Sequence, residues 1–371
     1  MWHSILPHSV FEMATMGYER EPCRPRYELE SYVTSIHDDN ARFTVRRNGK
    51  LFHIRVSPSH FVNSPATTKM YLSYLEVLRS GEEVIGDIYD TDVFEWVTRP
   101  FEPLFAQLAP SPALPDNDGS ITVTLKEYLF PSFFIFALDV VGEKLQPRRI
   151  ESKKSPYSPS RVWLDDDYLD DLEGWTALYD PAGVVLSFDN PEDALFKPPR
   201  KVLIDDGRTA CFFKPCYSTV QTQNELQAYK NISAANLDPH LNVCRLFGVV
   251  MDDGGSVVGL LLTYIDHGGH TLSTNVDPDH PSACTRKRWM DQLEATLAEL
   301  HRAGIVWGDV KAENVLVDRE DNVWITDFGG GYTEGWVERQ MAGTMEGDLV
   351  GMAKLREFIF QDEAQERWWT G

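Results

Sequence analysis

The chain has 371 residues, of which 42% are hydrophobic and 12% aromatic, so it is long and apolar enough for roughly two or three globular domains. Its 57 acidic and 35 basic side chains give a formal net charge of −22. That charge argues against nucleic acids and anionic membranes as partners and favours a monomer. No stretch is long and apolar enough for a transmembrane helix, the N-terminus lacks the pattern of a signal peptide, and the five cysteines are scattered. We therefore expect an intracellular protein, cytoplasmic or nuclear, with reduced thiols.

The first part of the chain has the pattern of a mixed, strand-rich domain. Alternating apolar residues on either side of Asn48-Gly49 predict a β-hairpin over residues 41–56. A short helix is expected over 67–78, and strand character returns over 121–141. We found no catalytic constellation here. The prediction is an accessory α+β domain of unknown function over residues 1–145.

Residues 146–174 have the composition of a linker. The stretch 146–161 is basic and rich in serine and proline, which is typical of an exposed connection. Five aspartates within 165–171 indicate a solvated turn, although Trp163 and Tyr168 suggest that the segment docks onto something.

Four elements follow, and a polar side chain accompanies the apolar pattern in the first two. An apolar strand over 208–213 ends in Lys214, and a helix over about 219–232 contains Glu225. The continuous apolar run 257–265 predicts a buried strand. A further helix is expected over 285–303, where its apolar stripe (Trp289, Leu293, Leu297 and Leu300) should form core and Gly304 should end it.

Residues 307–329 carry the strongest chemical signal. Strands over 315–317 and 323–326 are joined by an acidic turn, so the residues at their outer ends, Asn314 and Asp327, should converge. Two oxygen ligands placed together in this way suit Mg²⁺, which is held by few protein groups plus substrate phosphates.

The loop before the first of these strands holds two further charged groups. Asp309 can orient or deprotonate an attacking hydroxyl, and Lys311 can neutralise a transferring phosphoryl group. The Asp-x-Lys-x-x-Asn motif followed by Asp-Phe-Gly resembles the catalytic and metal-binding loops of the eukaryotic protein kinase superfamily. The lysine two residues after the aspartate resembles the serine/threonine branch.

The resemblance implies a two-lobed, protein-kinase-like α+β fold over residues 175–371 that uses ATP and Mg²⁺. Asp309 and Lys311 are then catalytic, and Asn314 and Asp327 are metal ligands. Lys214, paired with Glu225, would bind the α and β phosphates. Residues 266–272 look like the hinge that frames adenine. The remaining implied nucleotide contacts are Thr263, Ile265 and Leu316.

Several positions depart from the family pattern. Gly308 stands before Asp309 where most protein kinases carry an arginine, so a phosphorylated activation loop would lack a local cation. Residues 193–200 contain no glycine, although a glycine-rich phosphate loop is expected there. Phe212 replaces the usual alanine against adenine. Finally, the chain ends 23 residues after Asp348, an aspartate expected to brace the catalytic loop, so the resemblance implies a truncated helical C-lobe.

The sequence leaves three functions open. A serine/threonine protein kinase would transfer the γ-phosphoryl group of Mg-ATP to a hydroxyl of an unknown protein. A pseudokinase would serve as a binding or scaffold module, which suits Phe212 and the missing glycine loop. A small-molecule kinase resembling the aminoglycoside and choline kinases would use a small-molecule hydroxyl as substrate.

Overall fold

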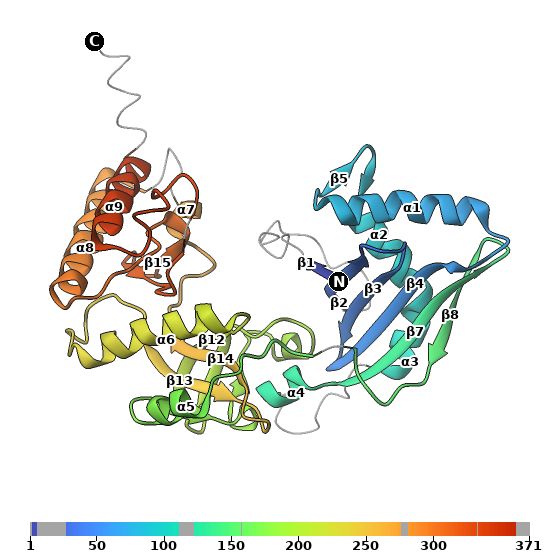
Figure 1. Cartoon of the computed structure of the whole chain (residues 1–371), viewed down its shortest axis with the longest axis horizontal. Coiled ribbons are helices and arrows are strands. Elements are labelled where there is room, and N and C mark those ends of the chain that lie inside the picture. The colour runs from blue at the N-terminus through green and yellow to red at the C-terminus, as the bar shows by residue number, and fades with distance from the viewer. Residues whose placement is uncertain are drawn as a thin grey trace, which may run out of the picture. The chain divides into compact units, whose positions relative to one another are not determined.

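The computed structural model divides the chain into two compact units of mixed α+β structure, which confirms the predicted fold class (Figure 1). Unit 1 comprises Met1–Pro159 and Val185–Pro199, and unit 2 comprises Ser160–Val184 and Arg200–Gly371. The structure describes residues 2–5, 27–110, 122–156, 158–275, 281–331 and 333–360.

Unit 1 is built on one mixed β-sheet with the strand order β1-β2-β3-β4-β7-β8. The hairpin predicted over 41–56 is present: β3 and β4 pair antiparallel, and Asn48 and Gly49 both adopt positive φ in the turn. Strands β4 and β7 run parallel. The bounds are β1 Trp2–Ile5, β2 Glu28–Ser35, β3 Ala41–Arg47, β4 Lys50–Val62, β7 Ser132–Val141 and β8 Lys144–Ile150.

Helices cover one face of this sheet. Helix α1 (Pro65–Ser80) contains the helix predicted over 67–78 and ends at Gly81 in the left-handed conformation. Helices α2 (Asp90–Thr98) and α3 (Glu102–Leu108) complete the layer. Phe52 and Phe105, whose ring centroids are 4.7 Å apart, belong to the core that the sheet and helices share. The smaller elements of unit 1 are β5 Val84–Ile85, β6 Ile88–Tyr89, η2 Arg99–Phe101, α4 Leu125–Leu129, β10 Val185–Leu186 and η4 Pro191–Leu195.

The opposite face of the sheet buries polar groups. Arg46 forms an ion pair with Glu30 at 2.9 Å and lies over the Tyr128 ring. His53 is fully buried, with Nδ1 3.2 Å from the Thr44 hydroxyl. Burial, helped by the charges of neighbouring arginines, lowers the pKa of His53 from 6.5 to about 4.

This shift predicts an acid-sensitive unit 1. The unfolded chain protonates His53 below pH 6.5, whereas the folded protein resists until about pH 4, so stability should fall as pH falls through this window. The full loss is about 3 kcal/mol. Urea unfolding of wild type and His53→Gln at pH 7, 6 and 5 measures it, because the variant should lack this part of the pH slope. Parallel pH curves for the two proteins would contradict the assignment.

The segment predicted as a linker over 146–174 is largely structured, and this corrects the predicted domain limits. Strand β8 continues to Ile150 at the edge of the sheet, where the missing N–H of Pro147 is tolerated. The aspartate run forms α5 (Asp166–Glu173) because Asp165 caps it by accepting a hydrogen bond from the Tyr168 N–H. Unit 1 thus extends beyond residue 145 and unit 2 begins before residue 175.

Unit 2 contains a second sheet, in which β11, β12, β14, β13 and β9 are neighbours in that order. The predicted strands over 208–213 and 257–265 appear as β12 (Thr209–Pro215) and β14 (Val257–Thr263). Helix α6 (Thr219–Ala234) packs on the sheet through Leu226, Tyr229 and Ile232 (Figure 1). The other bounds are β9 Ala177–Tyr179, η3 Pro181–Gly183, β11 Lys201–Ile204 and β13 Leu246–Met251.

The remainder of unit 2 is mainly helical. Helix α8 (Ala283–Arg302) buries the predicted stripe and packs beside α9 (Met345–Ile359). The Cα of Gly351 in α9 lies so close to Val310 that a Cβ there would be 2.5 Å from the valine side chain. The short elements are α7 Leu272–Asn275, η5 Ala312–Asn314, β15 Val315–Val317 and β16 Val323–Ile325. Within the described ranges, no helix is both long and apolar enough to cross a membrane.

Candidate active site

Lys214 lies between two carboxylates that come from different parts of unit 2. Its Nζ is 2.8 Å from Oε1 of Glu225 on α6 and 2.9 Å from Oδ1 of Asp327 after β16. Burial alone would lower the pKa of Lys214, but the two carboxylates outweigh it and raise the pKa. The Glu225 side chain is 4% exposed, and its burial raises its own pKa against the opposing effect of Lys214. Lys214 therefore stays charged and joins the sheet, α6 and the segment after β16.

The hairpin predicted between Asn314 and Asp327 is present. Hydrogen bonds hold the two residues at its open end next to each other. Strands β15 and β16 pair antiparallel, and the N–H and hydroxyl of Thr326 both donate to the Asn314 carbonyl, at 3.1 and 2.9 Å. Asp327 has φ +62°, a left-handed conformation that costs a non-glycine residue on the order of 1 kcal/mol. The strained backbone turns its carboxylate toward Lys214.

Asp309, Lys311 and Asn314 form a second hydrogen-bonded group. Oδ2 of Asp309 accepts from Lys311 Nζ at 2.7 Å and from Asn314 Nδ2 at 3.0 Å. Asn314 Nδ2 also donates to the Asp309 carbonyl at 2.8 Å. The carboxylate is only 11% exposed, so these donors hold it in one orientation.

Thr333 completes this group and was missed by the sequence reasoning. Its hydroxyl donates to Asp309 Oδ1 at 3.2 Å and accepts from Lys311 Nζ at 3.0 Å. The contact joins residues 24 positions apart and follows no motif spacing. The only signal was a hydroxyl in the short segment after Asp327. Tyr332, the neighbouring hydroxyl in that segment, lies outside the described residues.

Glycine allows the backbone to pass close to Asp309. A Cβ at Gly331 would lie 3.1 Å from Asp309 Oδ2, so a side chain there would press on the carboxylate. Gly308, directly before Asp309, has φ +87°, which favours glycine. Position 308, where most protein kinases have an arginine, therefore requires a positive φ in this chain, which glycine adopts readily.

Asp348 braces the loop as expected. Its Oδ2 accepts from the Trp307 N–H and its Oδ1 from the Gly308 N–H, both at 2.8 Å. His301 Nε2 is also 2.8 Å from Oδ2. Trp307 Nε1 donates to the Thr326 carbonyl at 2.8 Å, which ties the loop to the hairpin that delivers Asp327.

The residues expected to contact the nucleotide lie in and around β14. The hydroxyl of Thr263 accepts from the Arg245 N–H at 2.9 Å, so it serves strand pairing. Ile265 is buried, and its carbonyl accepts from the His267 N–H at 2.9 Å. Leu316 is half-buried in β15, and Phe212 lies two residues before Lys214, on the same face of β12. In the described part of the chain, no hydrogen bond or ion pair joins the side chain of Thr263, Ile265 or Leu316 to Lys214.

The oxygen donors present fit Mg²⁺. Among the described residues, no hydrogen bond reaches Oδ1 of Asn314 or Oδ2 of Asp327, so an amide and a carboxylate oxygen remain available. Such hard oxygens, with substrate phosphates, are what Mg²⁺ prefers. In these same ranges, no group of three or more His, Cys, Asp and Glu side chains is arranged so that it could hold a metal ion by itself.

The segment expected to cover the phosphates belongs mostly to unit 1. Residues 185–199 belong to unit 1, and the Leu195 carbonyl accepts from the Gly49 N–H at 2.8 Å. Gly49 is in the turn between β3 and β4. The glycine-free stretch 193–200 is therefore packed mostly as part of the accessory unit.

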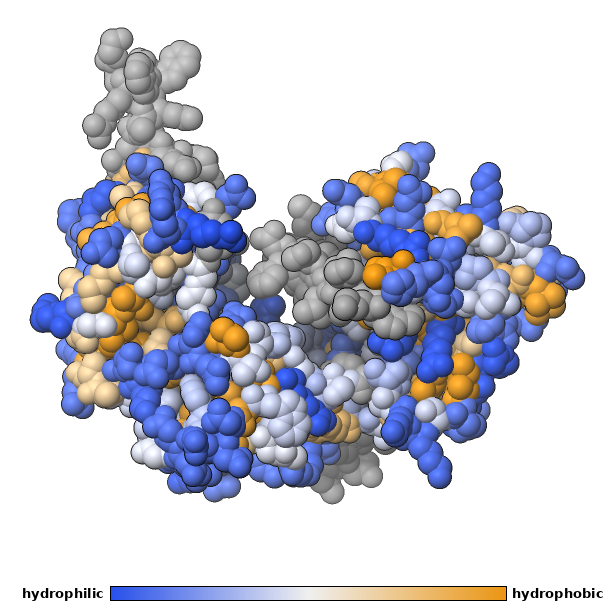
Figure 2. Space-filling view, in the orientation of Figure 1, coloured by the Kyte–Doolittle hydropathy of each residue, from blue (hydrophilic) through white to orange (hydrophobic). Residues whose placement is uncertain are grey.

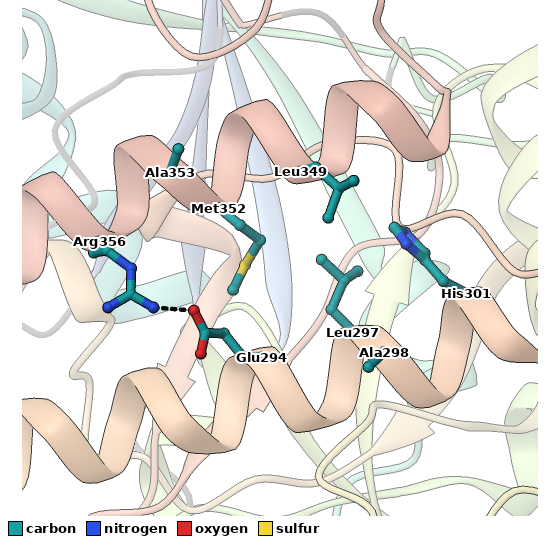
Figure 3. A pocket seen from close by; sticks show the side chains of 8 residues that line it. All are labelled: Glu294, Leu297, Ala298, His301, Leu349, Met352, Ala353 and Arg356. Carbon is teal, nitrogen blue, oxygen red and sulfur yellow. Dashed lines mark hydrogen bonds and ion pairs between the residues drawn. The ribbon is translucent and has the colours of Figure 1, made fainter.

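A separate hollow of about 380 Å³ lies between α8 and α9 (Figure 3). Leu297, Leu349 and Met352 form its apolar floor, and the Glu294–Arg356 ion pair lies at one end. Leu349 is 60% exposed, and hydrophobic residues gather on this side of unit 2 in Figure 2. The lining contains none of the predicted catalytic or metal-binding residues, so we assign no chemistry to it.

Comparison with known proteins agrees with the geometry. Residues 213–344 match the family described as protein kinase domain. Maternal embryonic leucine zipper kinase of Danio rerio is 31% identical over 105 residues, which cover 28% of this chain and 14% of that protein. A probable serine/threonine-protein kinase of Arabidopsis thaliana is 28% identical over 123 residues, covering 29% of this chain and 17% of that protein. Cyclin-dependent kinase C-2 C of the same plant is 26% identical over 126 residues, covering 34% of this chain and 19% of that protein.

The matched segments span less than a fifth of the length of each of these curated relatives. Within this chain the family match over residues 213–344 contains Lys214, Glu225, Asp309 and Asp327. Residues 213–344 therefore belong to the protein-kinase-like superfamily.

Proposed function

We propose that this protein is an ATP-dependent phosphotransferase, acting as a serine/threonine protein kinase that transfers the γ-phosphoryl group of Mg-ATP to a hydroxyl. The observation that carries the proposal is the pair of charged groups described above. Lys214 is held by Glu225 and Asp327, and Asp309 is held by Lys311 and Asn314. Phosphoryl transfer requires positioning and charge stabilisation more than covalent chemistry, and these groups supply both.

The roles follow from the chemistry of each side chain. Asp309 orients the attacking hydroxyl and accepts its proton as the oxygen bonds to the γ-phosphorus, while the bond from that phosphorus to the bridging oxygen of ADP breaks. Lys311 neutralises charge on the transferred group, and Lys214 binds the α and β phosphates. Asn314 and Asp327 would hold Mg²⁺, which supplies further neutralisation of the phosphates.

The preference for a protein hydroxyl rests on Lys311 and on the relatives. Lys311 is the lysine typical of the serine/threonine branch. Its Nζ forms hydrogen bonds with both the Asp309 carboxylate and the Thr333 hydroxyl. One of the relatives is described as a serine/threonine-protein kinase.

A second function, that of a nucleotide-independent binding module, is favoured by one specific observation. Residues 185–199, which precede β11, are packed in unit 1 and contain no glycine between 193 and 199. A protein without a glycine loop loses backbone N–H groups that would cradle phosphates.

Two measurements on the purified full chain separate these functions. Mg²⁺-dependent thermal stabilisation by ATP reports binding, and saturation at 100 times Kd should add about 2.7 kcal/mol. ATP turnover is then followed with a protein mixture and with a panel of small-molecule alcohols. Turnover that needs protein supports the proposal, whereas turnover only with the alcohol panel favours a small-molecule kinase. Absence of both stabilisation and turnover would overturn it in favour of the binding module.

Phe212→Ala should leave the Kd for Mg-ATP unchanged or lower it. The phenyl ring of Phe212 is on the same face of β12 as Lys214, and its removal opens space beside the implied purine site. Isothermal titration of the folded variant measures this, with Phe247→Ala as the control because Phe247 is exposed on another strand of the sheet. Weaker binding only in Phe212→Ala would mean that the ring itself forms part of the nucleotide site.

A further inference from the structure

Residues 160–179, here called the strap, are attached to the sheet of unit 2 at both ends. They lie outside residues 213–344, which match the protein kinase domain family. At one end, Val162 exchanges two backbone hydrogen bonds of 2.9 Å with Val257 at the start of β14. At the other end, β9 adds a parallel strand to β13. Helix α5 lies between these two attachments.

Helix α5 contacts α6 through polar groups on both sides of Glu225. Lys230 Nζ on α6 is 2.6 and 2.8 Å from the two carboxylate oxygens of Asp171. The Tyr168 hydroxyl donates to the Gln223 carbonyl at 3.3 Å. These two contacts are separated by seven residues, two turns of α6, with Glu225 in between.

Helix α5 also adds an apolar side chain to the core that α6 lines. Leu172 of α5 is 1% exposed and belongs to the core cluster that contains Leu226 and Ile232 of α6. At the start of α6, Val220 is 67% exposed, and Tyr217, just before the helix, is 64% exposed. The strap therefore contributes two polar contacts to α6 and one buried leucine to the core that α6 also lines.

Glycine at position 248 permits this attachment. A Cβ on Gly248 in β13 would lie 2.4 Å from the Tyr179 ring and 2.7 Å from the Ala177 carbonyl of β9. A side chain at position 248 would push the backbone of β9 away from β13. The absence of a side chain at Gly248 therefore lets β9 pair with β13.

We propose that Tyr168 and Asp171 of the strap are positioning residues, which hold α6 so that Glu225 keeps Lys214 in place for phosphoryl transfer. The inference rests on the proposed function for its catalytic consequence, but the bracing of α6 is independent of it. Because α5 belongs to the same chain and contacts α6, it lowers the conformational entropy that is lost when Glu225 binds Lys214. The site is then assembled by the chain's own upstream segment.

Charge exchange tests the brace. Asp171→Lys and Lys230→Glu should each increase hydrogen exchange of the amides of residues 219–234 in the nucleotide-free protein, and each should lower kcat about three- to tenfold. The double exchange Asp171→Lys/Lys230→Glu should restore both readouts. Asp291→Lys is the matched control, because the Lys287–Asp291 pair is an exposed ion pair on α8.

A second comparison separates positioning from simple stabilisation. In a Glu225→Gln background, Asp171→Lys should lower kcat no further, because the path to Lys214 is already broken. Independent, multiplicative losses in that background would overturn the positioning role. Tyr168→Phe, which removes only the hydroxyl, should raise exchange near residue 223 with little loss of melting temperature.

The outcomes distinguish this inference from the proposed function. If wild type shows no ATP turnover, the proposed function fails, and the exchange data alone decide whether the strap braces α6. If α6 exchange is unchanged in both single variants, or is not restored by the double exchange, the brace is wrong whatever the turnover.

Discussion

Asp327→Asn should reduce phosphoryl transfer at least about 100-fold, equivalent to roughly 2.7 kcal/mol of barrier. The carboxylate accepts from Lys214 Nζ at 2.9 Å and is the anionic member of the implied metal pair. An amide is a poorer Mg²⁺ ligand and cannot form the ion pair. Asparagine is among the residues that best tolerate φ +62°, so the backbone and the melting temperature should change little. Turnover and the Kd of Mg-ATP are the quantities to measure.

Asp321→Asn provides the matched control for this result. Asp321 also has positive φ, at +59°, and lies in the turn of the same hairpin, away from Lys214. The control should keep wild-type rate and affinity. Unchanged rate and affinity in Asp327→Asn itself would remove Asp327 from the metal site.

Asp309→Asn should lower kcat by about 10²- to 10⁴-fold while leaving the Kd of Mg-ATP within about twofold, the range expected when a general base is removed. The amide is isosteric with the carboxylate but cannot accept the hydroxyl proton. Three donors, from Lys311, Asn314 and Thr333, point at this group, and one of them would have to reorient. Single-turnover kinetics and nucleotide titration separate the two effects.

Glu313→Gln is the control, since Glu313 is an exposed acid in the same loop. Its rate should match wild type. A variant Asp309→Asn that turns over at the wild-type rate would exclude Asp309 as the base, and equal losses in both variants would point to a general effect of charge in the loop.

Local spacing explains why much of the candidate site could be predicted. Asp309, Lys311 and Asn314 lie within six residues, and the β15–β16 hairpin places Asp327 beside Asn314 by a tight turn. The β3–β4 hairpin was predictable for the same reason, because Asn48-Gly49 suits the positive φ that its turn requires. Pairing Lys214 with Glu225 needed the family resemblance, since glutamates on helices are common.

Contacts between distant residues explain what was missed. The aspartate run at 165–171 suggested a solvated turn, yet it forms a capped helix in which Tyr168 finds a partner on α6, more than fifty residues away, and Leu172 is buried in the core of unit 2. Nothing local marks Thr333 as a partner of Asp309. The assignment of residues 185–199 to unit 1 likewise depends on the Leu195–Gly49 contact.

The sequence by itself determined the likeness of residues 213–344 to protein kinase domains, because the Asp-x-Lys-x-x-Asn and Asp-Phe-Gly motifs and the hairpin between them are short-range patterns set by turn geometry and strand pairing. Only the tertiary structure decided that the strap belongs to unit 2 and contacts α6, and that Thr333 orients Asp309. Those features depend on long-range packing, in which side chains many residues apart bury each other, and no local periodicity encodes such a choice of partner.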